Sequence, residues 1–521
     1  MLDTLFKDTR IVDGSGNPWF RGDVGVDAGR ISAVGDLTGS SARSVVDAHD
    51  SYLTPGFIDV HTHSDFSLPA FPRAESLISQ GITTEIVGNC GLTPHPVGPD
   101  RLDLIQKYTA FLGAKMPWDW SSTAEFLGYL ESLPLSHDVV TLVGHGSIRV
   151  AVMGFDDRAP TAGELDLMKK YVGQAMEAGA AGLSSGLIYA PGSSAASDEL
   201  SELCSVVRRF RGIYTTHLRD ESTGLMSAVE EALQIGKSAG VPVQFSHHKV
   251  MGEANWGLVR ESLARIDRAR REGQDVTLDQ YPYTGSSTTF SVFLPGWALE
   301  GGVARLLERL GEEETRRRIA LAAQGTDWSQ VLIAGLARAE HKEYEGLSIH
   351  QLGAALGKDP FEAALELTLA EEGPFSIVRF GMAEQDVKYV MRHPHVMVAS
   401  DGHAMSPELG GKPHPRSYGT FPRVLGRYTD ALGGLSLEES VRKMTSLPAQ
   451  RFGLWDRGLI RPGQRADLNM LSPTISDTAT FNDAHSYSRG VESVLVNGEL
   501  VWNEGGDTGA RVGRVVRSSR A

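Results

Sequence analysis

The chain has 521 residues, of which 41% are hydrophobic and 22% charged, an ordinary composition for a globular protein with more than one domain. The formal net charge of −15 argues against nucleic acid as a partner, because phosphate binding needs a basic surface. With 2 cysteines there is no disulfide framework, and neither a signal-peptide pattern nor an apolar run of ~18 residues occurs, so we expect a cytoplasmic enzyme with a small-molecule substrate and no membrane contact.

The sequence patterns at both ends of the chain predict β-strands. Residues 1–55 alternate in polarity and carry turn signals such as Asp13-Gly14. Residues 450–521 contain Asn497-Gly498, a strong two-residue hairpin turn. We therefore expect one small β-sandwich domain, built from residues 1–55 together with residues 450–521.

The middle of the chain, residues 56–449, alternates short apolar strands with amphipathic helices. Expected helices cover 162–178, 197–211, 222–239 and 256–272. Strands are expected at 56–63, 84–90, 139–146, 180–186, 212–217, 241–248, 275–283 and 395–402. Eight strands alternating with helices predict a parallel α/β fold, and eight is the number that closes a (β/α)8 TIM-like barrel.

The alternative fold is an open doubly wound sheet, but no Gly-rich dinucleotide turn follows the first strand. The interval between the seventh and eighth strands is long. We interpret it as an inserted subdomain or lid, at about residues 285–350.

Polar side chains follow seven of the eight strands, at the end where barrel enzymes keep their active sites. These residues are His61, His63, Asp65, Cys90, His145, His217, His247, His248, Lys249, Tyr281, Tyr283 and Asp401. His61 and His63 are two positions apart on a strand, so their side chains point the same way. A single strand-end histidine is more often structural, but this convergence favours a metal site, and imidazole with thiolate suits zinc.

Cys90 ends the second strand, in "TTEIVGNCGLTP" (83–94), and has three possible roles. It can be a packed structural thiol, a nucleophile or a metal ligand. A nucleophile needs an adjacent base and oxyanion donors. Cys204 lies in the helical stretch "DELSELCSVVRRF" and is expected to be simply packed.

The motifs together resemble a known family. "PGFIDVHTHSD" (55–65) and "ASDG" (399–402) are similar to the amidohydrolase superfamily, metal hydrolases on a (β/α)8 barrel with a β-sandwich made from both termini. A finer resemblance is to the N-acyl-D-amino-acid deacylases, or D-aminoacylases. It rests on "GNCG" (88–91), "THLRDE" (216–221), "SHHK" (246–249), "DQYPY" (279–283) and "HPRSYGTFPRVLG" (414–426).

The resemblance implies a zinc-dependent hydrolase that cleaves the amide of N-acyl-D-amino acids. Strand four, "AAGLSSGLIY", lacks the bridging lysine of many amidohydrolases, and Cys90 occupies the place of the cysteine ligand of the deacylases. The implied ligands are Cys90, His217 and His247 for a tight zinc site, and His61 and His63 for a second, weaker site. The choice between His247 and its neighbour His248 stays open.

The resemblance also implies roles on the substrate side. Asp401 is the implied catalytic carboxylate, acting as general base and then general acid. Lys249 and Arg416 are expected to bind the substrate's α-carboxylate with help from Ser287, and Tyr281 to assist zinc in stabilising the oxyanion, unless it is only a packed ring. The segment from Asp401 to Arg416 is somewhat longer than the family's usual one, which leaves the placement of Arg416 open.

Other functions compete with this one. A related amidohydrolase acting on another N-acyl, peptide-like or cyclic amide is the main alternative, and a non-catalytic scaffold is the second. The stretches "KMPWDW" (115–120) and "FSVFLPGW" (290–297), in loops expected to shape the pocket, are aromatic-rich and favour an apolar pocket.

Overall fold

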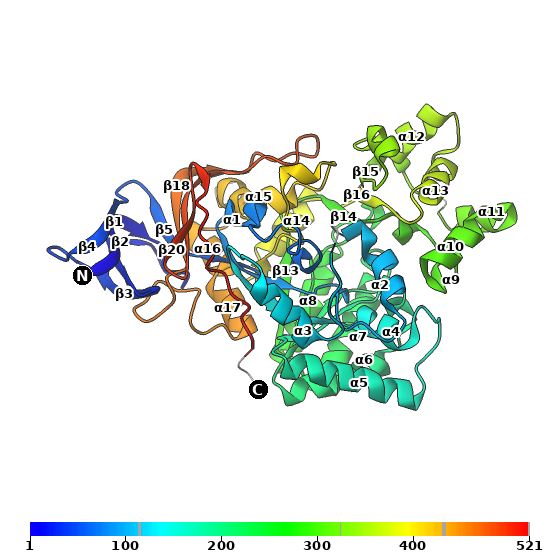
Figure 1. Cartoon of the computed structure of the whole chain (residues 1–521), viewed down its shortest axis with the longest axis horizontal. Helices are drawn as coiled ribbons and strands as arrows, with labels where there is room; N and C mark the ends of the chain where they lie inside the picture. The colour runs from blue at the N-terminus through cyan, green and yellow to red at the C-terminus, as the bar shows by residue number, and fades with distance from the viewer. Residues whose placement is uncertain (113–115, 324, 430–433, 519–521) are drawn as a thin grey trace.

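The computed structural model describes residues 1–112, 116–323, 325–429 and 434–518. Three parts follow one another along the longest axis (Figure 1). They are a β-rich part built from both ends of the chain, a central barrel, and a segment inserted between the last two barrel strands. In the described ranges, no helix has both the length and the apolar character needed to cross a bilayer.

The central barrel consists of short, buried, parallel strands. These are β6 (Phe57–Asp59), β7 (Ile82–Val87), β8 (Asp138–Thr141), β9 (Val143–Gly144), β10 (Gly182–Gly186), β11 (Ile213–His217), β12 (Val243–Phe245), β13 (Val276–Gln280) and β17 (Val396–Val398). β8 and β9 are two halves of one strand, so the ring has eight positions. A parallel bridge between Thr62 and Gly402 closes it between β6 and β17. The predicted (β/α)8 barrel is confirmed.

Helices cover the outside of the barrel close to their expected ranges. They include α5 (Ala162–Glu177), α6 (Ser197–Arg209), α7 (Leu225–Ala239) and α8 (Val259–Arg271). α5 begins with a capping box in which Thr161 and Glu164 satisfy each other's backbone N–H groups. The apolar faces of these helices and the strands beneath them share one buried cluster.

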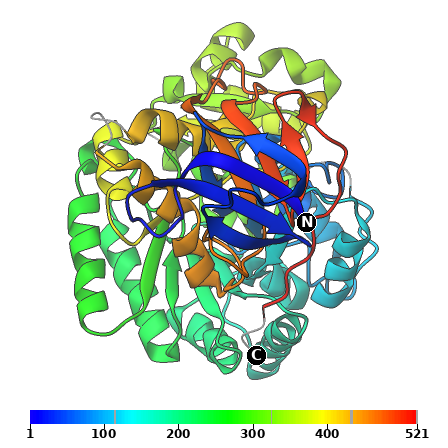
Figure 2. The same ribbon diagram turned by 90° about the vertical axis from the view of Figure 1, so that its left-hand side faces the viewer.

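The two ends of the chain form one nine-stranded sheet, which faces the viewer in Figure 2. Its strands are β1 (Leu2–Ile11), β2 (Phe20–Asp27), β3 (Arg30–Gly35), β4 (Ala42–Asp47), β5 (Tyr52–Pro55), β18 (Leu468–Ser476), β19 (Arg489–Val496), β20 (Glu499–Asn503) and β21 (Gly506–Asp507). β5 pairs with β18, which joins the N-terminal and C-terminal halves. Asn497 and Gly498 have φ of 52° and 86° and turn the chain between β19 and β20, as the hairpin signal predicts.

The inserted segment has its own sheet and its own core. β14 (Gly285–Thr289), β16 (Ser376–Phe380) and β15 (Val331–Gly335) pair antiparallel in that order. Helices α9 (Gly296–Leu299), α10 (Gly302–Leu310), α11 (Glu313–Ala322), α12 (Ile349–Leu356) and α13 (Pro360–Ala370) pack with them around a separate apolar cluster. Because β16 belongs to this sheet, the inserted unit extends to residue 380 (Figure 1).

Candidate metal centre and active site

The thiol of Cys90 is surrounded by imidazoles at the C-terminal ends of the barrel strands. Its Sγ atom lies 3.3 Å from Nε2 of His61, 3.5 Å from Nδ1 of His217 and 3.4 Å from Nε2 of His247. All four side chains are buried. Cys204, in contrast, is packed in the apolar cluster beneath α6, where burial raises the pKa of its thiol. The surroundings of Cys90 are therefore three imidazoles, whereas those of Cys204 are apolar.

A second group of donors adjoins the first. Nε2 of His63 lies 3.1 Å from Oδ1 of Asp401, and Nε2 of His61 lies 3.4 Å from the same oxygen. The other ring nitrogen of His61, Nδ1, faces Oδ1 of Asp279 at 3.3 Å. As their spacing predicts, His61 and His63 point to the same side, where both meet Asp401.

Three of these residues have a strained backbone. Cys90, His247 and Asp401 have φ of 54°, 34° and 52°, in the left-handed region that residues other than glycine rarely adopt. Such a conformation costs about 1–3 kcal/mol per residue and persists where the surrounding structure imposes it. All three residues lie two or three positions beyond the end of a barrel strand, and strain at such positions points to a function.

In this cluster, burial and the attraction between opposite charges shift the pKa values of the side chains in opposite directions. Burial disfavours the Cys90 thiolate, but the charges of His61 and His247 hold the thiol's pKa well below its usual range. Burial likewise opposes ionisation of Asp401, yet Arg416 and then His61 hold the pKa of that carboxyl well below its ordinary value. Burial disfavours the charged form of His63, but its interactions with Asp401 and Cys90 together raise the pKa of the imidazole to about 9.

This donor set fits a metal ion. Three overlapping groups each bring three ligand atoms within 4.8 Å of one another: His61 with Cys90 and His247, His61 with His63 and Asp401, and His217 with Glu221 and His247. Thiolate, imidazole and carboxylate are the ligands that zinc prefers. The buried Nδ1 atom of His63 has no hydrogen-bond partner among the described residues. This atom is free to take part in ligation or to orient a ligand.

Glu221 is a further functional candidate, which its position in the sequence alone does not single out. Its Oε2 faces Nε2 of His217 at 3.5 Å, and its Oε1 lies 3.2 Å from Nδ1 of His247 and 2.7 Å from Nζ of Lys249. In each of these two histidines, Glu221 contacts the ring nitrogen that points away from Cys90. The signal was present: Glu221 closes the motif "THLRDE", four residues after His217.

Cations lie on the other side of the cluster. Nη1 of Arg416 donates to Oδ2 of Asp401 at 2.7 Å. The Tyr281 ring lies between Arg416 and Lys249, 5.1 Å from the first and 5.7 Å from the second. Burial raises the pKa of Tyr281 to about 12, and its hydroxyl contacts only the Met382 sulfur at 3.8 Å within the described chain.

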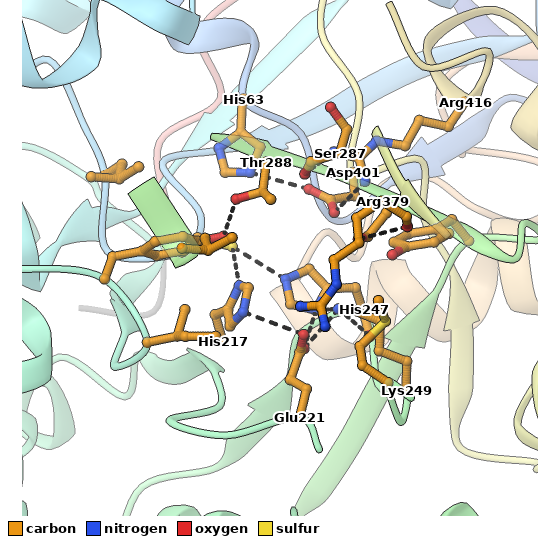
Figure 3. A pocket seen from close by; sticks show the side chains of 18 of the residues that line it. His63, His217, Glu221, His247, Lys249, Ser287, Thr288, Arg379, Asp401 and Arg416 are labelled. Atoms are coloured by element: carbon orange, nitrogen blue, oxygen red, sulfur yellow. Dashed lines mark hydrogen bonds and ion pairs between the residues drawn. The ribbon is translucent and has the colours of Figure 1, made fainter. Parts of the chain in front are cut away.

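A cavity of about 350 Å³ opens over these residues, within the ~300–1,000 Å³ range of small-molecule sites (Figure 3). Of the predicted site residues, it is lined by His63, Cys90, His217, His247, Lys249, Tyr281, Ser287, Asp401 and Arg416. His61 lies behind them, in contact with Cys90. Tyr189, Arg379 and His403 also line the cavity, and no sequence motif pointed to Arg379 or His403.

Other strand-end residues do not reach the cavity. His145 begins helix α4 (His145–Met153) and bonds Glu199 at 2.7 Å. His248 bonds the Ser262 hydroxyl at 2.8 Å, so His247 is the histidine of this pair that meets Cys90. Tyr283 packs against Arg423 and Phe481. Phe290, from the aromatic stretch 290–297, belongs to the core of the inserted unit, and Lys115 lies outside the described residues.

Comparisons with known proteins point the same way. The profile of the amidohydrolase family matches residues 44–502. The D-aminoacylase of Alcaligenes xylosoxydans xylosoxydans is 36% identical over 526 residues, covering 100% of this chain and 98% of that protein. The N-acyl-D-aspartate deacylase of the same organism is 37% identical, with coverages of 99% and 95%.

One solved structure is similar over its whole length. It is the crystal structure of N-acyl-D-glutamate deacylase from Bordetella bronchiseptica, complexed with zinc and a phosphonate inhibitor that mimics the tetrahedral intermediate. The two folds agree with a TM-score of 0.84 at 36% identity, covering 99% of each chain.

Proposed function

This chain belongs to the amidohydrolase family, and we propose that it is a metal-dependent deacylase that hydrolyses N-acyl-D-amino acids to a carboxylate and a free D-amino acid. The observation that carries the proposal is the Cys90 thiol among three imidazoles, with Asp401 beside them in a cavity that also holds cations. Burying and straining these donors costs free energy, which is not expected of a scaffold without catalysis.

The proposed division of the metal ligands into two sites follows the resemblance to the deacylases and is supported by the contacts of Cys90 with His217 and His247. Cys90, His217 and His247 are proposed to hold zinc tightly, and His61 and His63 to form a second, weaker site beside Asp401. When bound, zinc acts as a Lewis acid and lowers the pKa of water toward ~7. Glu221 orients His217 and His247 through the ring nitrogens that point away from Cys90.

Asp401 is the proposed proton carrier. Because Arg416 and His61 keep its pKa low, its carboxylate is ionised at neutral pH and can accept the proton of the attacking water. The same carboxyl then donates that proton to the leaving amine. Tyr281 remains protonated at this pH, so its hydroxyl can donate to the oxyanion that develops on the substrate carbonyl.

The substrate's α-carboxylate is proposed to bind where Lys249, Arg416 and Ser287 converge. Arginine offers a bidentate fork and lysine a point charge. Both cations flank Tyr281, so the carboxylate is held next to the proposed oxyanion donor. These few local cations explain how a chain of net charge −15 accepts an anionic substrate.

Two wider assignments accompany the activity. We propose residues 1–55 with 450–521 as one domain and 56–449 as the catalytic barrel, whose insertion begins at about 285. We also propose a cytoplasmic location, because a reducing compartment keeps the free thiol of Cys90 available for metal.

The test is an assay of the zinc-loaded protein with paired N-acetyl-D- and N-acetyl-L-amino acids of methionine, leucine, phenylalanine and glutamate. Release of free amino acid from D-substrates alone supports the proposal. No release from any pair, with zinc shown to be bound, overturns it and moves attention to cyclic or larger amides.

A further inference from the structure

Arg379 reaches the active-site cavity from the inserted unit. It lies on β16, directly opposite Ser286 of β14, and both residues line the cavity. Its guanidinium packs on the ring of Phe293, 5.2 Å from the centroid. In Figure 3 the side chain extends into the middle of the pocket, across from His63 and His217. A rigid strand and an aromatic ring thus hold a cation at the open side of the metal cluster.

Arg379 differs from the other cations of the cavity in its partners. Lys249 is neutralised by Glu221 at 2.7 Å, Arg416 by Asp401 at 2.7 Å, and Arg219 by Glu231 at 2.9 Å. Over the described parts of the chain, no carboxylate lies within ion-pair distance of Arg379. The side chain is partly buried, and this desolvation lowers the pKa of its guanidinium, although the more distant charge of Glu221 acts in the opposite direction.

An uncompensated, partly buried cation costs free energy unless an anion arrives to pair with it. Two carboxylates that line the cavity, Glu221 and Asp401, already pair with Lys249 and Arg416, so we expect an anion that pairs with Arg379 to come from the substrate. Arginine prefers a carboxylate, which it binds with two parallel hydrogen bonds. The guanidinium of Arg379 is therefore suited to bind a carboxylate of the substrate.

We propose that Arg379 binds a second carboxylate of the substrate, an inference that rests on the deacylase activity above. The α-carboxylate is assigned to the pair that flanks Tyr281, on the barrel. Arg379 stands apart from that pair, on another element and on a different aromatic ring. The enzyme then selects dicarboxylic N-acyl-D-amino acids, with the extra carboxylate on the amino-acid side chain or on the acyl group.

Two substrate pairs distinguish these sources. N-acetyl-D-glutamate against N-acetyl-D-glutamine tests the side chain, and N-succinyl-D-leucine against N-butanoyl-D-leucine tests the acyl group. We expect kcat/KM of the zinc-loaded protein to favour the dicarboxylate by about 10- to 100-fold in one of the pairs, the usual effect of a charged hydrogen bond. Arg379→Gln abolishes that preference, and Arg379→Lys retains part of it.

Arg219→Gln is the matched control. Arg219 lines the same cavity but is already paired with Glu231, so its replacement keeps the preference ratio. Equal rates within both pairs overturn the inference. So does an equal loss on all four substrates in Arg379→Gln, because Arg379 then serves the α-carboxylate.

Failure of the proposed activity is recognised separately. If none of the four substrates is hydrolysed, the deacylase assignment falls, and calorimetric binding of the same compounds decides the role of Arg379. Tighter binding of a dicarboxylate to the unmodified protein, lost in Arg379→Gln, supports that role. Equal affinities within both pairs overturn it.

Discussion

Two regions meet in the active-site cavity and differ in almost every physical respect. The barrel rim, defined here as Cys90, His217, His247 and Asp401, is buried, and each side chain contacts another polar group of the cluster. The inserted wall, defined as Ser286–Thr288, Val292 and Arg379, is only partly buried, and its arginine has no anionic partner in the described chain. The contrast agrees with our proposals that the rim performs the chemistry and that the wall selects the substrate.

The contrast has a structural cause. Rim residues come from strands whose carboxyl ends meet at one face, so a shift in any of them disturbs all the others. The wall belongs to a sheet with its own apolar core around Phe290 and Ile377. Its side chains can therefore vary without moving the metal ligands, as expected for a region that sets specificity.

Metal removal should have the largest effect. Chelation is expected to abolish hydrolysis of every substrate, because the proposed mechanism needs the metal to lower the pKa of the attacking water, and added zinc should restore it. The melting temperature should fall as well, since a ligand that binds only the folded state stabilises it. Activity that survives with no metal detectable would contradict the assignment of the rim.

The two cysteines give a matched control for that experiment. Cys90→Ala should lose tight zinc binding and activity together. Cys204→Ala should retain both and lose only about 1 kcal/mol of stability, because a small apolar side chain in the core is replaced by a smaller one. Zinc content, initial rates and urea unfolding measure the three quantities.

Asp401→Asn is expected to lower kcat by about 10²- to 10⁴-fold for all substrates, the range of a general acid–base group. The amide has nearly the same shape but cannot carry the proton. Zinc at Cys90 should remain bound and the far-UV circular dichroism unchanged. A variant that loses activity on only some substrates would place Asp401 with the inserted wall and not with the rim.

Glu221→Gln should weaken zinc binding by about 10- to 100-fold, as is usual for a group that orients metal ligands. The reason is its contact with both His217 and His247, on the ring nitrogens away from Cys90. Competition with a chromophoric chelator measures the affinity. Glu230→Gln, at a surface pair with Arg265, is the control and should leave zinc affinity unchanged.

The rim was largely predictable from the sequence, and the wall was not. A polar residue after an apolar run marks the end of a strand. This pattern places Cys90, His217 and Asp401 on one face of the barrel from the sequence alone. The pair His247-His248 could not be resolved this way, because a positive φ at His247 changes the direction of its side chain.

Residues that depend on tertiary placement had no comparable signal. Arg379 lies almost 100 positions after the end of β13, in an antiparallel strand whose register is set only by its pairing with Ser286. His145 follows an apolar strand like the others, but helix α4 begins at this residue and carries its ring toward Glu199. Local pattern therefore predicts which residues end a strand, and not which way the chain then turns.

The smallest expected effect lies where the wall touches the barrel. The hydroxyl of Thr288 lies 3.2 Å from the hydroxyl of Tyr189, whose ring packs 4.9 Å from that of His217. Thr288→Val removes this link and should raise KM by about 2- to 10-fold, the worth of one neutral hydrogen bond, with kcat unchanged. The neighbouring Thr289→Val is the matched control, because the Thr289 hydroxyl is buried without a partner in the described structure. A change in kcat instead of KM would show that the wall also positions the metal ligands, and the division between chemistry and selection would no longer hold.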